Sequence, residues 1–507
     1  MVNHYLCTMK LFKHIFLFSI LSVFVLSSCK KDKILSDSSA KLGFSTDSVL
    51  FDTVFTQVGS TTKSFRIYNS EKQTLNISKV YLGGGTNSQF RINVDGFSGT
   101  TLSDIEILAG DSLYVFVQVT VNPFSALSPL LIKDSVIFET NGNIQHVSLT
   151  AIGRDVYLHK PNVFPTNGLP PYSIIGDGTG TCHHTIWTND KPHLIFGYAV
   201  VDSCCILEMQ PGTQVYLHKY AVLWVYKDGS LQVHGTYGNE VTFEGDRLEP
   251  DYKEIPGQWG KIWLMKGSIN NSFDWAKIKN GSIGIQAEEP DATGTLPFLS
   301  LKHTIIKNMT AAALYTQKAH VECSHCVFAN CGQYVAALTR GGIYNFQQCT
   351  FANYWNSNPN NATGGNAGGS RTSPLFVLNN HYIDNTNTEI VYQMDSIAYF
   401  GNCIIYGELD DEMALDSAEG VPGYNLKYYF DHCMVKSASL STTLAGHYNT
   451  VYRNIDPSFV DISINNYKLS SNSQAINHGA FLGSIDYDLN NYFSSDGLLD
   501  IGAYEYH

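Results

Sequence analysis

A cluster of aromatic and amide side chains, Tyr354-Trp355-Asn356, lies in a stretch where the spacing of the surrounding sequence breaks down. The glycine-rich run 364–369 follows, so the composition is that of a long loop. Aromatic faces stack on the CH groups of sugars, and Asn amides bond sugar hydroxyls. Loops also carry a large share of binding residues. Tyr354, Trp355 and Asn356 are therefore the candidate ligand-binding residues, with a carbohydrate as the expected ligand.

Acidic side chains offer a second chemistry. A polysaccharide lyase holds Ca²⁺ with carboxylates and uses an Arg or Lys base. The candidate groups are Asp274 with Ser324 and Gln347 in one outward column, Glu288-Glu289 with Asp291, and Asp410-Asp411-Glu412. The last two are expected in loops, away from a shared exposed face. The aspartates Asp486, Asp488, Asp496 and Asp500 could bind Ca²⁺ or shape turns. Ca²⁺ is thus the one cofactor left open, and no catalytic or metal-binding residue is assigned.

Histidine and cysteine clusters favour structural roles. His303, His325 and His432 share an outward column, and the first two are expected on adjacent turns, stacked and exposed without a ligand. Cys182-His183-His184 with His193 has a metal-like composition, but its spacing favours an entry loop of the fold. Cys323, Cys326 and Cys331 lack a matching fourth ligand pair. After Cys7 and Cys29 are set aside, nine of the 11 Cys remain, an odd count that argues against full pairing into disulfides.

The N-terminus determines the expected compartment. Behind Lys10 and Lys13, an apolar-plus-serine stretch over 15–26 leads to Ser28 and Cys29. This resembles the lipobox of bacterial lipoproteins, in which the signal peptide (1–28) is cleaved and Cys29 carries the lipid. The apolar core is too short for a transmembrane helix. Lys30 follows the Cys where an Asp tends to retain lipoproteins at the inner membrane, so the resemblance implies an outer-membrane protein, on its periplasmic or surface face. Translation starts at Met1 or Met9.

Composition agrees with an exported β-rich protein. Charged residues make up 15% and aromatic residues 12% of the chain. The formal net charge is −13, and the signal carries two of the positive charges, so the mature chain is more acidic still. Such a surface repels nucleic acid. The expected partners are the membrane, through the lipid, and a polysaccharide or host surface, with the chain itself monomeric.

Two folded units follow a lipidated linker over 29–41. From 42 to 155, period-two patterns recur at 49–55, 63–68, 75–80, 112–119, 134–138 and 145–151, with turn signals at 83–85 and 141–143. They predict a β-sandwich of about seven strands. The order of Val58-Gly59, Phe90, Gly110-Asp111-Ser112 and Ala151-Ile152-Gly153 resembles immunoglobulin-like domains of the Hydin and abnormal-spindle type, which act as spacers or interaction modules.

The second unit, 156–484, is a repeat. One template (apolar, two polar, small, any, apolar, any, Asn) aligns segments that begin at Phe273, Leu301, Cys323, Phe346, Phe400 and Phe430. Spacings of about 22–28 residues suit one coil of a right-handed parallel β-helix. Equivalent residues should then stack, so that Cys326, Cys349, Cys403 and Cys433 form one buried column and the terminal Asn residues a ladder. Part of the 54-residue jump from Cys349 to Cys403 is expected to be one further coil.

The closing segment, 485–507, is expected to cap the last open edge of the solenoid. Asp456-Pro457-Ser458-Phe459, Ala475-Ile476-Asn477 and Asp500-Ile501-Gly502-Ala503-Tyr504-Glu505 resemble the C-terminal part of choice-of-anchor Q domain proteins, which are bacterial surface β-helix proteins. Gln474 and His478 depart from that pattern. The overall prediction is an all-β chain with an Ig-like sandwich and a parallel β-helix. It favours non-catalytic glycan or surface binding over the alternative, a polysaccharide lyase or hydrolase.

Overall fold

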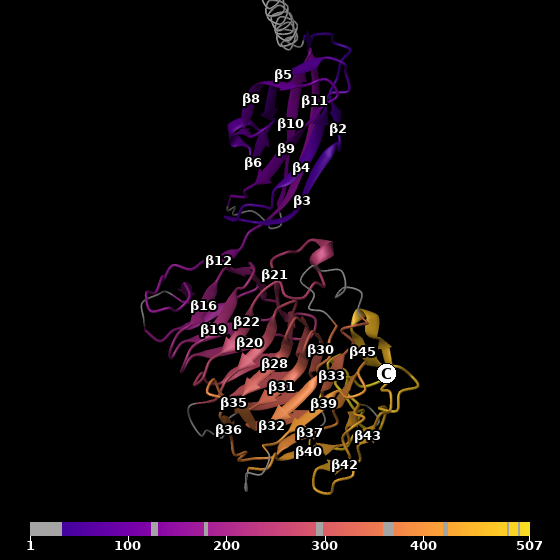
Figure 1. Ribbon diagram of the computed structural model, residues 1–507. Helices are drawn as coiled ribbons and strands as arrows, with labels where there is room; N and C mark the ends of the chain where they lie inside the picture. Colours follow the sequence, from indigo (N-terminus) through magenta and orange to yellow (C-terminus); the bar gives the residue numbers. More distant parts are fainter. Residues whose placement is uncertain are drawn as a thin grey trace, which may run out of the picture. The chain divides into compact units, whose positions relative to one another are not determined.

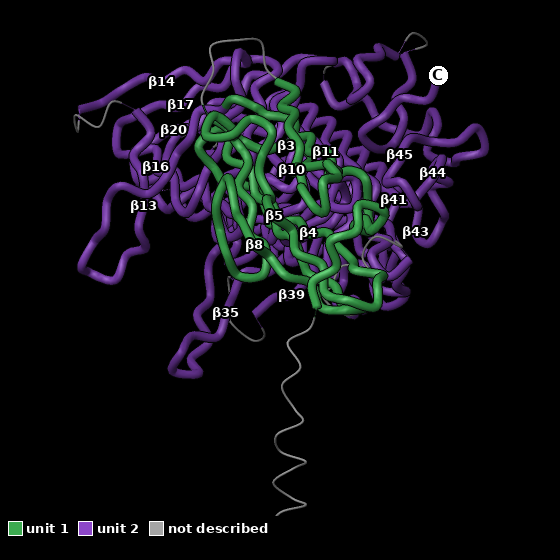
Figure 2. Tube along the Cα trace, turned by 90° about the horizontal axis from the view of Figure 1, so that it is seen from above, with its two compact units in different colours: residues 1–155 green, residues 156–507 purple. Residues whose placement is uncertain are grey.

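The computed structural model describes residues 33–122, 130–176, 181–290, 298–357, 370–418, 424–483, 486–494 and 497–507. The chain divides into two compact units, Met1–Asp155 and Val156–His507 (Figures 1 and 2). Both are built from strands, so the predicted all-β fold is confirmed.

The first unit is a sandwich of two sheets. One sheet has the order β1-β5-β10-β11-β3, with β8 on β5, and the other β2-β4-β9-β6-β7. The strands are β1 (Ile34–Leu35), β2 (Gly43–Phe44), β3 (Ser48–Phe55), β4 (Lys63–Tyr68), β5 (Thr74–Leu82), β6 (Phe90–Val94), β7 (Phe97–Gly99), β8 (Thr101–Ile107), β9 (Ser112–Val119), β10 (Leu130–Thr140) and β11 (Asn143–Arg154), with a short 3₁₀ helix η1 (Gly85–Asn87).

The period-two patterns form this sandwich for the expected reason. In β9 the residues Val115, Val117 and Val119 face a common core and are fully buried, while the residues between them face out. The hairpin β10–β11 turns at Asn141 and Gly142, whose φ values of 52° and 77° suit a two-residue turn. Each of the six predicted strand patterns lies in a strand.

The second unit is a parallel β-helix with three sheets, here called the first, second and third sheets. The first contains β12 (Tyr157–His159), β15 (His193–Ile195), β18 (Gln214–Leu217), β21 (Val241–Gly245), β24 (Ala276–Lys279), β27 (Ile305–Met309), β30 (Val327–Cys331), β33 (Thr350–Asn353), β38 (Ile404–Gly407), β41 (Met434–Val435) and β43 (Tyr452–Arg453). The second contains β13 (Tyr172–Ile174), β16 (Tyr198–Val201), β19 (Val222–Val225), β22 (Lys261–Leu264), β25 (Ile283–Ala287), β28 (Ala312–Gln317), β31 (Tyr334–Thr339), β34 (Phe376–Asn379) and β39 (Met413–Asp416). The third contains β14 (His184–Trp187), β17 (Ile206–Met209), β20 (Ser230–His234), β23 (Asn271–Asp274), β26 (Leu299–Lys302), β29 (His320–Ser324), β32 (Ile343–Gln347), β37 (Ala398–Gly401), β40 (Tyr428–Asp431) and β42 (Tyr448–Asn449).

The predicted columns are confirmed by the strand register. Val327 pairs with Thr350, Thr350 with Ile404, and Ile404 with Met434. The residues just before these strands, Cys326, Cys349, Cys403 and Cys433, therefore stack on consecutive turns, and all four are fully buried. In the neighbouring column the rings of Phe346, Phe400 and Phe430 stack with centroids 5.4 and 4.8 Å apart. The interior thus repeats one shape on each turn.

The predicted asparagine ladder also forms. The amide of Asn308 donates to Oδ1 of Asn280 over 3.3 Å, and that of Asn330 donates to Oδ1 of Asn308 over 2.6 Å. All three have φ between 53° and 67°, which Asn tolerates better than most residues. The ladder fixes a left-handed turn at the end of each of these first-sheet strands.

The 54-residue spacing from Cys349 to Cys403 contains no further coil, so the prediction of an additional coil there is wrong. Strand β33 pairs directly with β38, which places both cysteines on adjacent turns. The extra residues instead lengthen the connections on either side of β34, and the second connection contains a hairpin of β35 (His381–Ile383) and β36 (Glu389–Val391). A further loop at 247–260 contains the 3₁₀ helix η2 (Pro250–Tyr252).

The solenoid strands end at Arg453, earlier than the predicted boundary at 484. The chain then forms the antiparallel pair β44 (Phe459–Asp461) and β45 (Asn466–Leu469), joined by η3 (Ile462–Ile464). The described residues of 454–507, here called the C-terminal segment, pack on the outer face of the first sheet, where Leu469 and Ala475 contact Ile404 and Met434. Figure 1 shows β45 beside the strands of the solenoid. The segment 485–507 is predicted to cap the last open edge; its described residues instead lie along the flank, where they bond His303, Gln348 and Thr350.

Candidate functional site

The turns from the third sheet to the first provide the surface against which the C-terminal segment lies. The third residue of each template segment forms this turn, with φ from 44° to 51° at Trp275, His303, His325, Gln348, Asn402 and His432. A left-handed turn points these side chains outward. Several then bond the C-terminal segment: Asn402 donates to the carbonyl of Ala480, and Gln348 donates to that of Asp500.

Trp275, His303 and His325 form a stacked column beneath this segment. The ring centroids are 4.4 Å apart for Trp275 and His303, and 5.6 Å apart for His303 and His325. The predicted stacking of the two histidines is confirmed, but their predicted exposure is wrong, because the C-terminal segment covers them and leaves them 7% and 6% exposed. Nδ1 of His303 lies 3.0 Å from Asp274, and Nε2 lies 2.9 Å from the carbonyl of Tyr487. Both ring nitrogens of His303 are thus engaged.

A groove of about 400 Å³ opens at the end of this column. Its aromatic wall consists of Tyr237, Trp275 and Tyr504, contributed by the β20–β21 turn, the β23–β24 turn and the C-terminal segment. Tyr237 is 53% exposed, and its ring meets Trp275 edge-on with centroids 5.4 Å apart. The size and the apolar lining are those of a small-molecule site.

Three polar groups converge on the same groove. Glu240 and Lys277 pair at 3.0 Å, and the side-chain amide nitrogen of Asn490 is buried without a hydrogen-bond partner. Burial opposes ionisation of Glu240, but backbone N–H groups and Lys277 outweigh it and hold the pKa of its carboxyl below the usual value. The groove therefore offers a carboxylate acceptor, an ammonium donor and an unused amide donor beside exposed aromatic surface.

The sequence prediction missed this groove because its residues come from distant segments. Tyr237 and Asn490 are 253 positions apart. One signal was available: Trp275 holds the template position that is His on three of the other turns, at His303, His325 and His432. A bulky aromatic side chain at an outward turn position needs a covering partner or a ligand.

The predicted ligand-binding residues lie in a different environment. The Trp355 ring is packed inside and only 2% exposed, so it offers no free face for a sugar to stack on. Tyr354 is partly buried and packs against Phe459 and Tyr467 of the C-terminal segment. Asn356 donates to the carbonyl of Arg371 over 3.2 Å and accepts from its N–H over 2.7 Å. The described part of this insertion thus uses its aromatic and amide groups to hold itself in place.

A buried ion pair anchors the same insertion. The guanidinium of Arg371 donates from both terminal nitrogens to Glu412, each over 2.7 Å, and both side chains are fully buried. Glu412 also accepts from the backbone N–H of Leu375 and of Leu409. Within the predicted acidic cluster at 410–412, Glu412 therefore has a structural role: it holds the insertion in place through Arg371.

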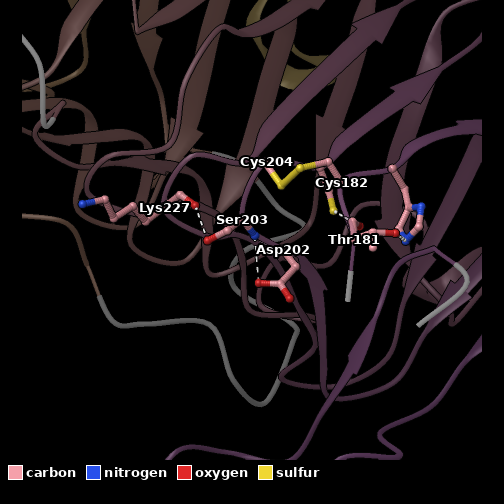
Figure 3. The surroundings of a disulfide bond; sticks show 8 residues. Thr181, Cys182, Asp202, Ser203, Cys204 and Lys227 are labelled. Atoms are coloured by element: carbon pink, nitrogen blue, oxygen red, sulfur yellow. Dashed lines mark hydrogen bonds between the residues drawn. A yellow bond between two sulfur atoms is a disulfide. The ribbon is translucent and has the colours of Figure 1, made fainter. Parts of the chain in front are cut away.

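The entry loop contains a disulfide that the odd cysteine count did not lead us to expect. Cys182 and Cys204 are bonded (Figure 3). Their Cα atoms lie 5.0 Å apart, and the two residues are separated by 22 positions in sequence. A spacing of 22 residues is about one coil, so it places the two cysteines on adjacent turns. This spacing was the available sequence signal for the disulfide. Beside the bond, the hydroxyl of Ser203 donates to the carbonyl of Lys227 (Figure 3). The disulfide therefore joins two adjacent turns at the surface.

The histidines near this loop do not gather around a metal. His184 pairs with Glu208 at 2.8 Å, whereas His193 stacks on Trp187 and lies 3.1 Å from His159. Burial lowers the pKa of His159 to about 4 and, together with the neighbouring His159, that of His193 to about 3. Across the described residues, no group of three His, Cys, Asp or Glu side chains is placed to hold a metal ion.

The other predicted acidic groups are engaged by protein donors. Asp488 and Asp500 accept backbone N–H groups of the C-terminal segment, including those of Tyr492 and Tyr506. Glu288 accepts from the Trp263 indole over 2.8 Å, and Glu289 pairs with Lys318 at 2.6 Å. Ser324 and Gln347 line a second, smaller cavity on the outer face of the third sheet, which Asp274 does not. Cys29, Asp291 and Asp496 lie outside the described residues.

Comparisons with known proteins leave the activity open. No family model and no curated protein matches the chain. Among solved structures, it is similar to PapD-like domain 7 of human CEP192, at 11% identity and a TM-score of 0.18, over 25% of this chain and 93% of that one. It is also similar to a family 123 glycoside hydrolase from Clostridium perfringens (4% identity, TM-score 0.16, 22% of this chain) and to the VesB protease of Vibrio cholerae (13%, 0.15, 23%). The chain spans 26% and 33% of the lengths of these two proteins, respectively. Within the described residues, no helix is long and apolar enough to cross a membrane. The similarities carry no argument about activity, so the functional assignment rests on the groove.

Proposed function

We propose that this chain is an exported lipoprotein, anchored in the outer membrane through Cys29, whose β-helix binds carbohydrate without cleaving it. The groove of Tyr237, Trp275 and Tyr504 is the observation that carries the proposal. In the same proposal, the C-terminal motifs that resemble choice-of-anchor Q domains belong to a bacterial surface protein, and the Ig-like sandwich is a spacer or interaction module.

Carbohydrate is the ligand class that best fits this lining. A sugar ring has apolar CH faces and a rim of hydroxyls, and the groove combines an exposed tyrosine face with polar groups at its edge. Sugar hydroxyls can accept from Lys277 and from the unpartnered amide of Asn490, and can donate to Glu240.

Binding without cleavage is favoured by the carboxylate content of the groove. Glycoside hydrolysis uses two carboxyl groups that flank the bond, one of them with a raised pKa. Among the described residues that line this groove, Glu240 is the one carboxylate, and its pKa is lowered. The alternative, a polysaccharide lyase with a Ca²⁺ site, gains no support from the described acidic residues.

The cysteine arrangement supports export. The disulfide Cys182–Cys204 bonds two exposed residues, and such bonds persist in oxidising compartments. The seven free cysteines of the described chain are all buried. Burial raises the pKa of Cys331 to about 12, which suppresses its thiolate.

The decisive experiment is a glycan array followed by calorimetry on the hits, with Tyr237→Ala as the test variant. Tyr220→Ala is the matched control, since Tyr220 is also exposed (70%) and does not line the groove. We expect binding that Tyr237→Ala removes and Tyr220→Ala retains. Incubation of each hit with and without EDTA, followed by analysis for new reducing or unsaturated ends, tests catalysis; any such product would contradict a binding-only function.

Anchoring is tested separately by metabolic labelling with palmitate. The unaltered chain should be labelled and Cys29→Ser should not. Protease accessibility on intact cells then shows which face of the outer membrane carries the protein. Labelling that survives in Cys29→Ser would rule out Cys29 as the lipid site without affecting the groove.

A further inference from the structure

A second cavity, of about 180 Å³, lies on the outer face of the third sheet. Strands β26, β29 and β32 form its floor, and Leu482, Asp486 and Leu499 of the C-terminal segment form its cover. It begins one turn beyond the aromatic groove, since His303 lines the groove and His325 lines this cavity. The two histidine rings stack between them, so the two spaces are adjacent but distinct.

Two buried polar groups in this cavity have no hydrogen-bond partner. Gln348 is 6% exposed, and its amide nitrogen donates to the carbonyl of Asp500 and to Glu505, which fixes the orientation of the amide. Its Oε1 is left without a donor. Nδ1 of His325, also 6% exposed, is likewise unpartnered. Buried polar atoms are mostly bonded in folded proteins. Both residues line the cavity, so these two atoms are the ones that we expect a ligand bound there to pair.

The rest of the lining limits what that partner can be. Donors and acceptors alternate: the Asn345 amide donates to Glu322 over 2.8 Å, and the Gln347 amide donates to Asn345 over 3.1 Å. The remaining polar residues of the lining are Ser300, Lys302, Ser324 and Asp486. Charges of both signs are therefore present, which disfavours a small anion. Burial, and then His303, lower the pKa of His325 to about 4, so its ring is neutral near pH 7.

Neutral hydroxyl groups match this lining. A hydroxyl both donates and accepts, so it can donate to Oε1 of Gln348 and can pair with Nδ1 of His325 in either tautomer. At ~30 Å³ per water, the cavity has room for about six waters, which is close to one sugar ring and too little for an oligosaccharide.

We propose that this cavity is a binding site for a single neutral sugar ring, either free or at the end of a chain. The sugar hydroxyls would bond Gln348, His325 and the polar residues of β29 and β32. The site does not depend on the groove at Tyr237: either can be occupied if the other binds nothing.

The test uses the mature full-length protein in detergent, with glucose, galactose and N-acetylglucosamine as probes, measured by calorimetry and by crystal soaks. Gln348→Met and His325→Phe remove the two orphan atoms while keeping similar volumes. Gln232→Met is the matched control, because Gln232 faces outward on the same sheet but lies outside the cavity. We expect at least one probe to bind, with affinity reduced tenfold or more by the first two variants and unchanged by Gln232→Met and Tyr237→Ala. Oligosaccharides that end in the same sugar distinguish a chain end from a free monosaccharide.

Other outcomes would overturn the proposal. One is electron density showing only ordered waters bonded to Gln348 and His325, with no probe binding at millimolar concentration. Another is binding that Tyr237→Ala abolishes and Gln348→Met leaves intact, which would assign the probe to the groove. A third is EDTA-sensitive binding of Ca²⁺ alone in place of any sugar. Thermal unfolding of each variant, compared with the unaltered protein, separates loss of the site from loss of the fold.

Discussion

The insertion after β33 and the C-terminal segment both cover the outside of the β-helix, but the polar side chains at the two places differ in their surroundings. In the insertion, Arg371 and Glu412 bond each other, and Asn356 bonds the backbone of Arg371. Asn490 of the C-terminal segment, and His325 and Gln348 of the solenoid turns beneath it, each have a buried polar atom without a partner. Arg371 also has one such atom, its Nε, so an unpartnered polar atom alone does not distinguish a loop anchor from a ligand site. The difference is that His325, Gln348 and Asn490 line a cavity and Arg371 lines neither of the two cavities described above.

The largest effect is expected from breaking the anchor of the insertion. Arg371→Met leaves the fully buried carboxylate of Glu412 without its cation, which should cost about 3–5 kcal/mol of stability. Urea denaturation followed by circular dichroism measures the loss. The control is Arg247→Met, which removes a partly exposed pair with Glu249 and should cost at most about 1 kcal/mol. Equal losses in both variants would mean that the buried pair has no special role.

Removing the disulfide should have the next largest effect. Cys182→Ser with Cys204→Ser opens a 22-residue loop and should lower the stability of the β-helix by about 3 kcal/mol. The melting temperature with and without reductant measures this. Iodoacetamide should leave the seven buried free cysteines unmodified until the chain is unfolded. A melting temperature indifferent to reductant would show that the two turns are held together by other contacts.

The C-terminal segment should respond to acid through His325. Its pKa is about 4 in the folded chain, mainly because it is buried, and about 6.5 in the unfolded chain. The unfolded state therefore binds the proton more readily as pH falls below 6.5, so stability is lost between pH 6.5 and 4. The loss should reach about 2 kcal/mol at pH 5 from this residue. Denaturation at pH 7 and pH 5 should show a correspondingly weaker pH dependence in His325→Phe; an identical dependence would contradict the buried neutral state.

The smallest expected change in free energy is the loss of binding on mutation of the groove, although this mutation tests the proposed function most directly. Tyr237→Ala removes a half-exposed ring and should leave stability unchanged, while glycan affinity falls tenfold or more, about 1.4 kcal/mol. Trp355→Ala should have the opposite effects. It leaves a buried cavity and should lower stability by about 3–5 kcal/mol, while glycan affinity stays unchanged in the folded variant. A variant of Trp355 that folds normally but loses binding would reassign the site to the insertion.

The repeat made the solenoid predictable because stacking imposes the same residue type on every turn. The small, buried Cys326 and Cys349 and the Asn ladder follow from that rule. The groove did not follow, because Tyr237, Trp275 and Asn490 belong to no shared period and meet only when the C-terminal segment folds back. The exposure of His303 was misjudged for the same reason: local spacing gives the direction of a side chain but not what later covers it.

The route of the C-terminal segment also has a consequence for biosynthesis. The carbonyl of Tyr487 contacts His303, 184 positions earlier in the chain. Until those last residues have emerged, outward apolar side chains such as Val327, Ile404 and Met434 have no cover. Pairing across such a separation is slow, and partly made chains with exposed apolar surface aggregate. A prematurely terminated copy should therefore expose these apolar side chains and aggregate more readily than the full chain.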